Sequence, residues 1–273
     1  MAMFADAAPP AAPAPTATGG KQTLVVCSPG SPGKTDEAQP RMDAFSSAVS
    51  AKAGTQIAAV YDPTNDGGVS RFASAGVGLV SLPFFLQHEK DLALHPRLTA
   101  VAKGRPANER WGLVVAKGKV KSAADLANYT INTNLAFSPG FVRGVVIGSL
   151  GALPASAKIQ QSTTVLSALR HAADGEPVAV VVDGTTEASL TSLPFAAKLE
   201  VVAHSPAAPA GIVVTIDARM PDKTWAGLEK AMLGLSADKA QATALDAIQM
   251  AGFVALDTKA LAEARKAFTD AAK

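Results

Sequence analysis

The sequence predicts an α/β protein of two lobes with a cleft between them. Short β-branched runs alternate with helical patterns, which is the order typical of a parallel sheet covered by helices. This alternation occurs in two successive rounds along 273 residues, and no composition break separates the rounds. The length suits two domains of about 100–150 residues, each able to bury its own core. We therefore expect two lobes, each a mainly parallel sheet flanked by helices and joined by crossing strands.

The first round runs from residue 23 to about residue 94. It opens with an apolar run that reads as a buried strand and ends in two successive Pro-Gly turns, after which Thr35 and Asp36 are placed to cap a helix. In open α/β sheets, ligands bind outside the carboxyl ends of the strands, so the segments after the strands are the candidate site. The expected elements are strands at 23–27, 56–61 and 77–82, helices at 37–54, 69–74 and 86–94, and a polar turn at 62–68.

The second round continues to the end of the chain. Its apolar runs are short, and its last part is rich in 3.6-residue periodicity. The expected elements are strands at 99–103, 111–116, 130–134, 159–161, 178–182, 199–204 and 211–216, helical segments at 122–128, 141–150 and 165–173, and a helix-rich tail at 220–273 with strong patterns at 225–235 and 240–251.

The chain is expected to cross between the lobes twice. Residues 22–107 and 207–273 would form the first lobe, and residues 108–206 the second, with the helical tail returning to the first lobe. Residues 1–21 are rich in Ala and Pro and lack the basic start and apolar stretch of a signal peptide. We interpret them as a flexible tether left after a leader was removed, as in an exported protein; a ragged start of a cytosolic protein is the alternative.

Composition argues against several classes of function. The net charge of +2 gives no basic footprint for nucleic acid. The single cysteine excludes an intrachain disulfide, and four scattered histidines form no metal-ligand spacing. No apolar run approaches the roughly 18–20 residues that span a bilayer. We expect neither a metal nor a cofactor.

Five segments, in a fixed order, carry a resemblance to a known family. They are LVVCSPGSP, RFASAGVGLVSLPFF, WGLVVAKGKVKSAADLANYTINTN, LSALRHAADGEPVAVVVDG and MAGFVALDTKALAEARKAF. Together they resemble the phosphate/phosphonate-type substrate-binding proteins of ABC transporters and, more broadly, the type 2 periplasmic-binding-protein fold. The resemblance covers residues 23–268 and rests on the order of the segments rather than on one sharp motif.

The resemblance implies a function in transport. It implies a monomeric, periplasmic or otherwise extracytoplasmic protein that captures a small, anionic ligand as its lobes close, and that delivers the ligand to an ABC permease. Two other classes stay open: a stand-alone sensor or partner-binding module, and an enzyme on the same fold. The sequence contains no G-x-S-x-G nucleophile motif, and no sequence pattern pairs a histidine with Cys27. We therefore expect no catalytic residues.

In the first lobe, the candidate ligand residues follow three strands. The loop after the first strand offers hydroxyls, amides and a charge to a ligand. A surface turn with a capping residue accounts for the same residues equally well. The spacing of glycines and lysine in this loop is not that of a nucleotide phosphate-binding loop. The residues after the second and third strands could contact a ligand, or they could simply form a turn and part of the core. These candidates are Ser28, Ser31, Lys34, Asp62, Ser81 and Phe84.

In the second lobe, the family resemblance points to the turn at 137–140. The family places a hydroxyl-rich turn there at a helix N-terminus, where free amides and the helix dipole bind anions, and Ser138 and Gly140 hold the matching positions. Arg110, near the first crossing, suits a bidentate grip on a carboxylate or phosphate but is equally placed for solvent. Asp183 and Thr185 end a buried strand, and Asp183 would repel a dianion.

Overall fold

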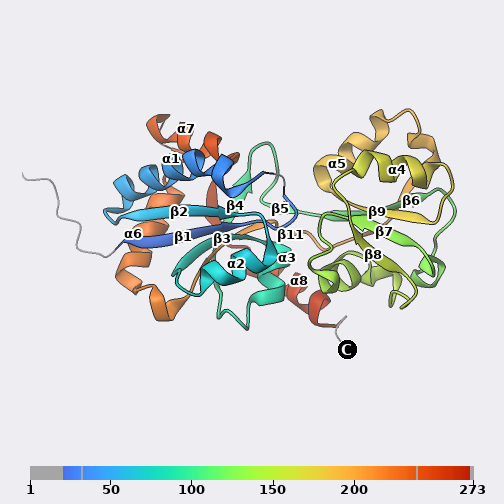
Figure 1. Ribbon diagram of the computed structural model, residues 1–273, viewed down its shortest axis with the longest axis horizontal. Coiled ribbons are helices and arrows are strands. Elements are labelled where there is room, and N and C mark those ends of the chain that lie inside the picture. The colour runs from blue at the N-terminus through green and yellow to red at the C-terminus, as the bar shows by residue number, and fades with distance from the viewer. Residues whose placement is uncertain (1–20, 32, 238, 271–273) are drawn as a thin grey trace, which may run out of the picture.

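The chain forms two lobes, each built on one β-sheet, that lie side by side along the long axis of the molecule (Figure 1). The structure is a computed structural model, which describes residues 21–31, 33–237 and 239–270. The expected tether at 1–21 lies outside these residues apart from Lys21. The strands are β1 (Gln22–Cys27), β2 (Ile57–Asp62), β3 (Val77–Ser81), β4 (His95–Ala102), β5 (Asn108–Glu109), β6 (Trp111–Ala116), β7 (Thr130–Thr133), β8 (Lys158–Gln161), β9 (Val178–Asp183), β10 (Leu199–His204), β11 (Ala208–Pro209), β12 (Gly211–Thr215) and β13 (Met250–Ala255). The α-helices are α1 (Thr35–Ala53), α2 (Asn65–Phe72), α3 (Leu82–His88), α4 (Val165–Ala173), α5 (Gly184–Ser189), α6 (Asp222–Leu233), α7 (Lys239–Ala247) and α8 (Thr258–Asp270).

Both sheets are mixed rather than mainly parallel. The first has the order β13-β4-β12-β3-β1-β2, in which β1 is parallel to β2 and β3 while β12 runs antiparallel between β3 and β4. The second has the order β10-β6-β9-β7-β8, in which β7 is parallel to β8 and β9 while β6 is antiparallel to both of its neighbours. The antiparallel strands β6 and β12 each follow directly after a crossing between the lobes. The first long strand after each crossing therefore runs antiparallel to both of its neighbours in the sheet.

Helices cover both faces of the first sheet. On one face, α1, α6 and α7 bury an apolar cluster that includes Phe45, Trp225 and Leu228. On the other face, α2 and α3 contribute Phe72 and Phe84 to a second cluster. Each of these side chains is at most 8% exposed, so the 3.6-residue apolar spacing of the helices accounts for the layer order.

The two lobes meet through a narrow strand pair and a shared apolar cluster. Between the sheets, β5 and β11 pair antiparallel over two residues each. The apolar cluster beneath α2 and α3 runs on without a break into the second lobe, where it includes Leu113, Phe141 and Val142. The lobes are therefore in direct contact in this structure.

The C-terminal helix α8 contacts both lobes at their junction (Figure 1). Its Arg265 binds Glu89 beside α3 in the first lobe, with Nε 2.9 Å from Oε2. Farther along the helix, the Phe268 ring packs on Gly140 in the second lobe. At its start, Asp257 caps the helix and accepts a 2.8 Å hydrogen bond from Asn108 in β5. The helix thus bridges the two lobes and the crossing strands.

Two expected segments have a different structure. The polar turn at 62–68 is largely helix, because Thr64 caps α2 by accepting a hydrogen bond from the Gly67 amide. The helical pattern expected at 240–251 ends early, and β13 begins at Met250 to pair antiparallel with the edge strand β4. In β13, pairing with a neighbouring strand outweighs the local helical preference.

Two expected helix starts also differ. Thr35 and Asp36 are the first residues of α1 rather than its caps, and Lys34 occupies the N-cap position without a side-chain hydrogen bond. The helix expected at 141–150 is a six-residue π-helical turn at Phe141–Val146 followed by a short 3-10 turn. The segment that directly follows the turn at 137–140 is consequently not a regular α-helix, and the first α-helix of the second lobe is α4.

Within the described part of the chain, no helix has both the length and the apolar character needed to cross a membrane.

Candidate functional site

The carboxyl ends of β1 and β2 place their polar residues differently. After β1, the hydroxyls of Ser28 and Ser31 lie 2.8 Å apart, and the Ser31 amide donates to the Ser28 carbonyl. Lys34 points to solvent at the start of α1, with its ammonium 3.8 Å from Glu37. At the end of β2, Asp62 is 7% exposed and faces its own lobe. The two serines are therefore hydrogen-bonded to each other within this loop.

Asp62 has its hydrogen-bonding capacity largely filled by its own lobe. Its Oδ2 atom lies 2.8 Å from Arg71 Nε, and Oδ1 accepts bonds from the Thr64 amide and hydroxyl. Burial on its own would raise the pKa of Asp62, but the bonds from Arg71 and Thr64 outweigh burial and lower it. Asp62 is thus an ionised side chain that orders the turn into α2.

The carboxyl end of β3 contributes a hydroxyl and an aromatic ring. The Ser81 hydroxyl is buried and has no hydrogen-bond partner among the described residues. The Phe84 ring is fully buried, with its centroid 6.0 Å from that of Phe72 and 4.7 Å from that of His88. Phe84 therefore packs in the core in this state of the protein.

The turn at 137–140 faces the first lobe. Ser138 is fully buried, and its hydroxyl lies 3.5 Å from the Pro83 carbonyl across the junction, while its amide donates to the Leu135 carbonyl. Gly140 lies under the Phe268 ring, since an added Cβ would be 3.1 Å from it. The structure brings Ser138 to the first lobe, whereas Gly140 is covered by α8.

Asp183 takes part in an ion network that spans the junction. It caps α5 by accepting a 2.8 Å bond from the Thr186 amide, and Thr185 beside it is exposed. Arg105, in the loop after β4, reaches across with Nη2 2.8 Å from Asp183 Oδ2. Its Nη1 lies 2.9 Å from Glu109 in the crossing strand β5.

This network shifts the pKa values of its members. Burial raises the pKa of Glu109, and this effect exceeds the opposing pull of the Arg105 guanidinium. Burial also acts to raise the pKa of Asp183, but the bond from Thr186 and the charge of Arg105 outweigh it and lower that pKa. One guanidinium thus serves two carboxylates, so the network carries a negative charge when both are ionised.

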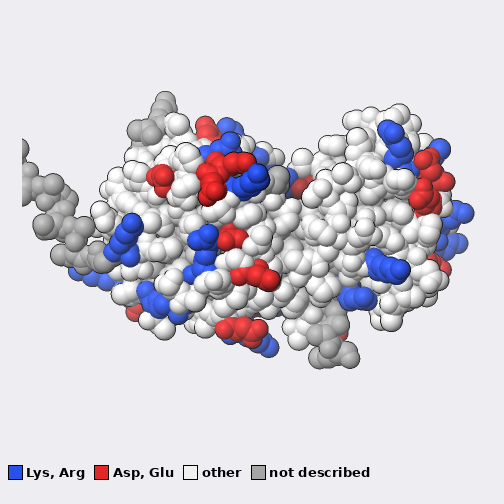
Figure 2. Space-filling model, in the orientation of Figure 1, with Lys and Arg blue, Asp and Glu red and all other residues white. Residues whose placement is uncertain are grey.

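Direct contacts leave little space between the lobes where the predicted residues converge. The backbone at Gly30, with φ +81°, packs so tightly on the second lobe that an added Cβ would lie 2.0 Å from the Asn134 carbonyl oxygen. Together with the Ser138–Pro83 and Arg105–Asp183 contacts, this approach joins the two lobes in this structure. On the face shown in Figure 2, a notch separates the lobes along the upper edge, and basic and acidic side chains are interspersed.

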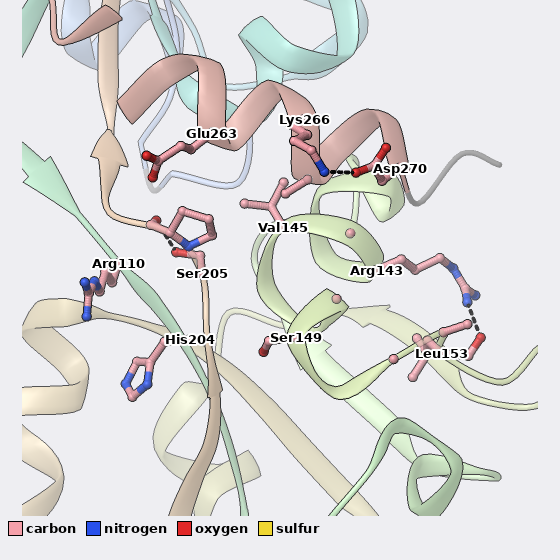
Figure 3. A pocket seen from close by; sticks show the side chains of 16 residues that line it. Arg110, Arg143, Val145, Ser149, Leu153, His204, Ser205, Glu263, Lys266 and Asp270 are labelled. Carbon is pink, nitrogen blue, oxygen red and sulfur yellow. Dashed lines mark hydrogen bonds and ion pairs between the residues drawn. The ribbon is translucent and has the colours of Figure 1, made fainter. Parts of the chain in front are cut away.

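Arg110 lies apart from the other predicted residues, in a pocket beside the crossing strands (Figure 3). The pocket has a volume of about 960 Å³ and lies between α8, the crossing segment around Ser205 and the second lobe's segment at 143–153. Arg110 and His204 lie on one side and Arg143 on the opposite side. A second, polar pocket of about 340 Å³ is lined by Gln161, Ser162 and Thr164 before α4.

Metal-ligand geometry is not evident in the described residues. No group of three or more His, Cys, Asp or Glu side chains there is arranged to hold an ion. Cys27 is buried with its sulfur 3.6 Å from the Thr64 carbonyl, and burial, together with the nearby Asp62 charge, raises its pKa to about 12.

The two sheets, their strand orders and the paired crossing strands define the type 2 periplasmic-binding-protein fold. The chain is similar to XAC2383 from Xanthomonas citri, solved with a chloride ion, at 15% identity over 92% of this chain and 98% of that one, with a TM-score of 0.69. It is also similar to the binding component of an ABC phosphonate transporter from Pseudomonas aeruginosa, at 18% identity over 88% and 83% of the two chains, with a TM-score of 0.60. A third similar structure is PhnD1 from Prochlorococcus marinus with methylphosphonate, at 14% identity over 91% and 98%, with a TM-score of 0.58.

These similarities confirm the fold that the sequence predicts. No protein-family model matches the sequence, and no curated protein is similar to it.

Sequence reasoning missed Arg105, Glu109 and the pocket beneath α8. The first two stand four residues apart in RPANER, which is a signal for an ion pair, but their partner Asp183 is distant in the chain. The pocket draws its walls from four separated segments, and no local pattern joins them.

Proposed function

We propose that the protein is an extracytoplasmic solute-binding protein of ABC-type uptake, which captures a small polar or anionic ligand between its lobes and delivers it to a permease. One observation carries the proposal: the carboxyl ends of strands from both lobes meet at one junction, bordered by a two-residue strand pair that can act as a hinge. The similar structures from Pseudomonas aeruginosa and Prochlorococcus marinus are binding proteins for phosphonates, which supports this class.

A ligand reaches the junction only when the lobes move apart. Ser138 is fully buried against Pro83 in the closed state, and the hydroxyls of Ser28 and Ser31 satisfy each other. Separation of the lobes exposes these three hydroxyls on opposite walls. Closure around a ligand then replaces the contacts between the lobes by contacts to the ligand, as in other hinged binding proteins.

The charges at the junction favour a neutral or singly charged ligand over a dianion. Arg105 already faces two carboxylates, those of Asp183 and Glu109. A doubly charged oxyanion would have to compete with both for one guanidinium and would be repelled by them. We therefore expect small polar molecules and monoanions to bind better than phosphate.

A thermal-unfolding screen tests this function. The panel includes phosphate, methylphosphonate, sulfate, small carboxylates, amino acids and sugars. A ligand at a hundred times its dissociation constant should add about 2.7 kcal/mol to the free energy of unfolding. Recovery of the ligand unchanged after incubation separates binding from catalysis.

Variants locate the ligand. Replacing two facing hydroxyls, in the double variant Ser31→Ala and Ser138→Ala, should weaken binding of any hit about tenfold or more, since each lost hydrogen bond contributes about 1 kcal/mol. Ser47→Ala, on an exposed face of α1, is the matched control and should leave affinity unchanged. Undiminished affinity in the double variant would place the ligand away from the junction.

A further inference from the structure

We infer that the pocket beneath α8 is a second binding site, separate from the junction of the lobes, for an organic monoanion with an apolar body. The pocket is open in this structure, in which the lobes are in contact, and its walls are α8, the crossing segment around Ser205 and the second lobe's segment at 143–153 (Figure 3). Its volume of about 960 Å³ lies in the range that small-molecule sites occupy.

The charges that line the pocket leave a surplus of one positive charge. Three basic side chains and two acidic ones line it, and one pair cancels because Lys266 lies 2.7 Å from Asp270. Two guanidiniums, of Arg110 and Arg143, then stand against the single carboxylate of Glu263. An anion with one charge balances the pocket.

Both guanidiniums have donors to offer. Arg110 has no hydrogen-bond or ion-pair partner among the residues that the structure describes, and its side chain is exposed. Arg143 makes one long bond, 3.4 Å from Nη1 to the Leu153 carbonyl. The guanidinium fork matches a carboxylate and binds it through two parallel hydrogen bonds.

The rest of the lining suits an apolar body. Apolar side chains and glycines make up most of the remaining wall, whereas the hydroxyls of Ser149 and Ser205 are few. The apolar members are Gly144, Val145, Gly148, Gly151, Ala152, Leu153, Pro206 and Ala267. A hydrocarbon or aromatic group buried there would supply affinity through apolar contact, while the acid group would fix its orientation.

Calorimetric titration of the full chain tests the site with four probes: phenylacetate and octanoate, and their uncharged counterparts 2-phenylethanol and octan-1-ol. The carboxylates should bind at least about tenfold more tightly than the alcohols, since a charge-assisted hydrogen bond to a guanidinium contributes more than a neutral one. Equal binding of acid and alcohol, or no binding of either acid, overturns the inference.

Two kinds of variant place the probes. An added Cβ at Gly148 would make an ordinary van der Waals contact, 3.8 Å from the Arg143 carbonyl oxygen, so Gly148→Leu should fold and fill the pocket. Ala152→Phe, at an exposed wall position, is the second blocking variant. Both should abolish carboxylate binding. At least one of Arg110→Gln and Arg143→Gln should weaken it about tenfold or more.

Arg170→Gln, on α4 away from the pocket, is the matched charge control and should change nothing. The inference is wrong if both blocking variants fold, as judged by their thermal unfolding, and still bind the carboxylates. The Ser31→Ala and Ser138→Ala double variant tests this site independently of the proposed function. It should weaken binding of a ligand at the junction and leave carboxylate binding beneath α8 unchanged.

Discussion

Removal of the Arg105 guanidinium should destabilise the protein, because it strands the carboxylate of Glu109 without a counter-charge. The Glu109 side chain is 6% exposed and that of Arg105 is 31% exposed. Breaking a buried ion pair by removing one partner costs about 3–5 kcal/mol, and solvent screening of the partly exposed guanidinium reduces this. We expect Arg105→Met to lower the free energy of unfolding by about 2–3 kcal/mol at neutral pH, or Tm by about 4–10 °C.

The loss should depend on pH. Burial raises the pKa of Glu109 in the folded state, so its stabilising contribution is present below the unfolded pKa and is lost as pH rises through the folded pKa. Without Arg105 the pKa of Glu109 in the folded state rises further, so the variant loses more free energy of unfolding as pH rises than the wild type does. Asp183 has a lowered pKa and contributes stability that is lost as pH falls, and Arg105→Met weakens this contribution too. The Glu109 effect makes the difference between wild type and variant grow as pH rises above about 4.3, whereas the Asp183 effect makes it shrink as pH falls below about 3.9.

Urea unfolding monitored by circular dichroism at several pH values measures both effects. The double variant Arg105→Met, Glu109→Gln should recover part of the lost stability, because the stranded charge is gone. Lys103→Met is the matched control: it breaks an exposed pair with Asp246, in which both side chains are more than half exposed, and should cost about 0.5 kcal/mol or less. An Arg105→Met variant that matches this control at all pH values would refute the reasoning.

Three further outcomes follow from the packing of the first lobe. Gly68→Ala should cost about 1–3 kcal/mol in urea unfolding, because its Cβ would lie 2.2 Å from Cys27 Sγ, and adding Cys27→Ala should relieve the overlap; an equal cost in both backgrounds would contradict this contact. Phe84→Ala should cost about 3–5 kcal/mol in the same assay, as expected for a fully buried ring, and a neutral effect would contradict its core position. Burial raises the pKa of Cys27 to about 12, so iodoacetamide should label it after unfolding and not in the native protein at neutral pH, as mass spectrometry would show.

Local sequence patterns account for much of the fold. The amphipathic run at 165–173 is helix α4, and the apolar run at 178–182 lies within strand β9. The secondary structure of such runs can be predicted locally because the period of their apolar residues determines which face is buried. The pattern fails where a distant partner matters more, as in β13, whose hydrogen bonds depend on β4.

The glycine pair at 67–68 shows the same limit at a single site. Consecutive glycines after a strand are consistent with an ordinary turn and also with the close approach of a ligand to the backbone. In the structure both lie in α2, and the space they leave is occupied by Asp62 and Cys27 of the same lobe. The glycines permit a close approach at these positions, but the sequence does not show that a helix forms there or which group makes the approach.

The strand-end positions of the candidate residues could be predicted from the sequence, whereas the contact between the lobes could not. The positions of the predicted residues at strand ends follow from topology, because parallel strands bring their carboxyl ends to one edge. Whether the lobes are apart or in contact depends on pairs such as Arg105 with Asp183, which no local pattern connects.

Under the proposed function, the contacts between the lobes also bear on affinity, because a ligand of the junction must compete with them. If a ligand enters only when the lobes are open, its apparent affinity decreases as the fraction of open molecules decreases. Arg105–Asp183 is one closed contact, and α8 adds others by holding Glu89 on one lobe and Gly140 on the other. Arg265→Met removes the ion pair between α8 and Glu89 of the first lobe and leaves the strand-end residues of the proposed junction site unchanged. If this pair helps to hold the lobes in contact, the variant should tighten binding of a junction ligand in calorimetric titration. Unchanged affinity would show that α8 does not hold the lobes together.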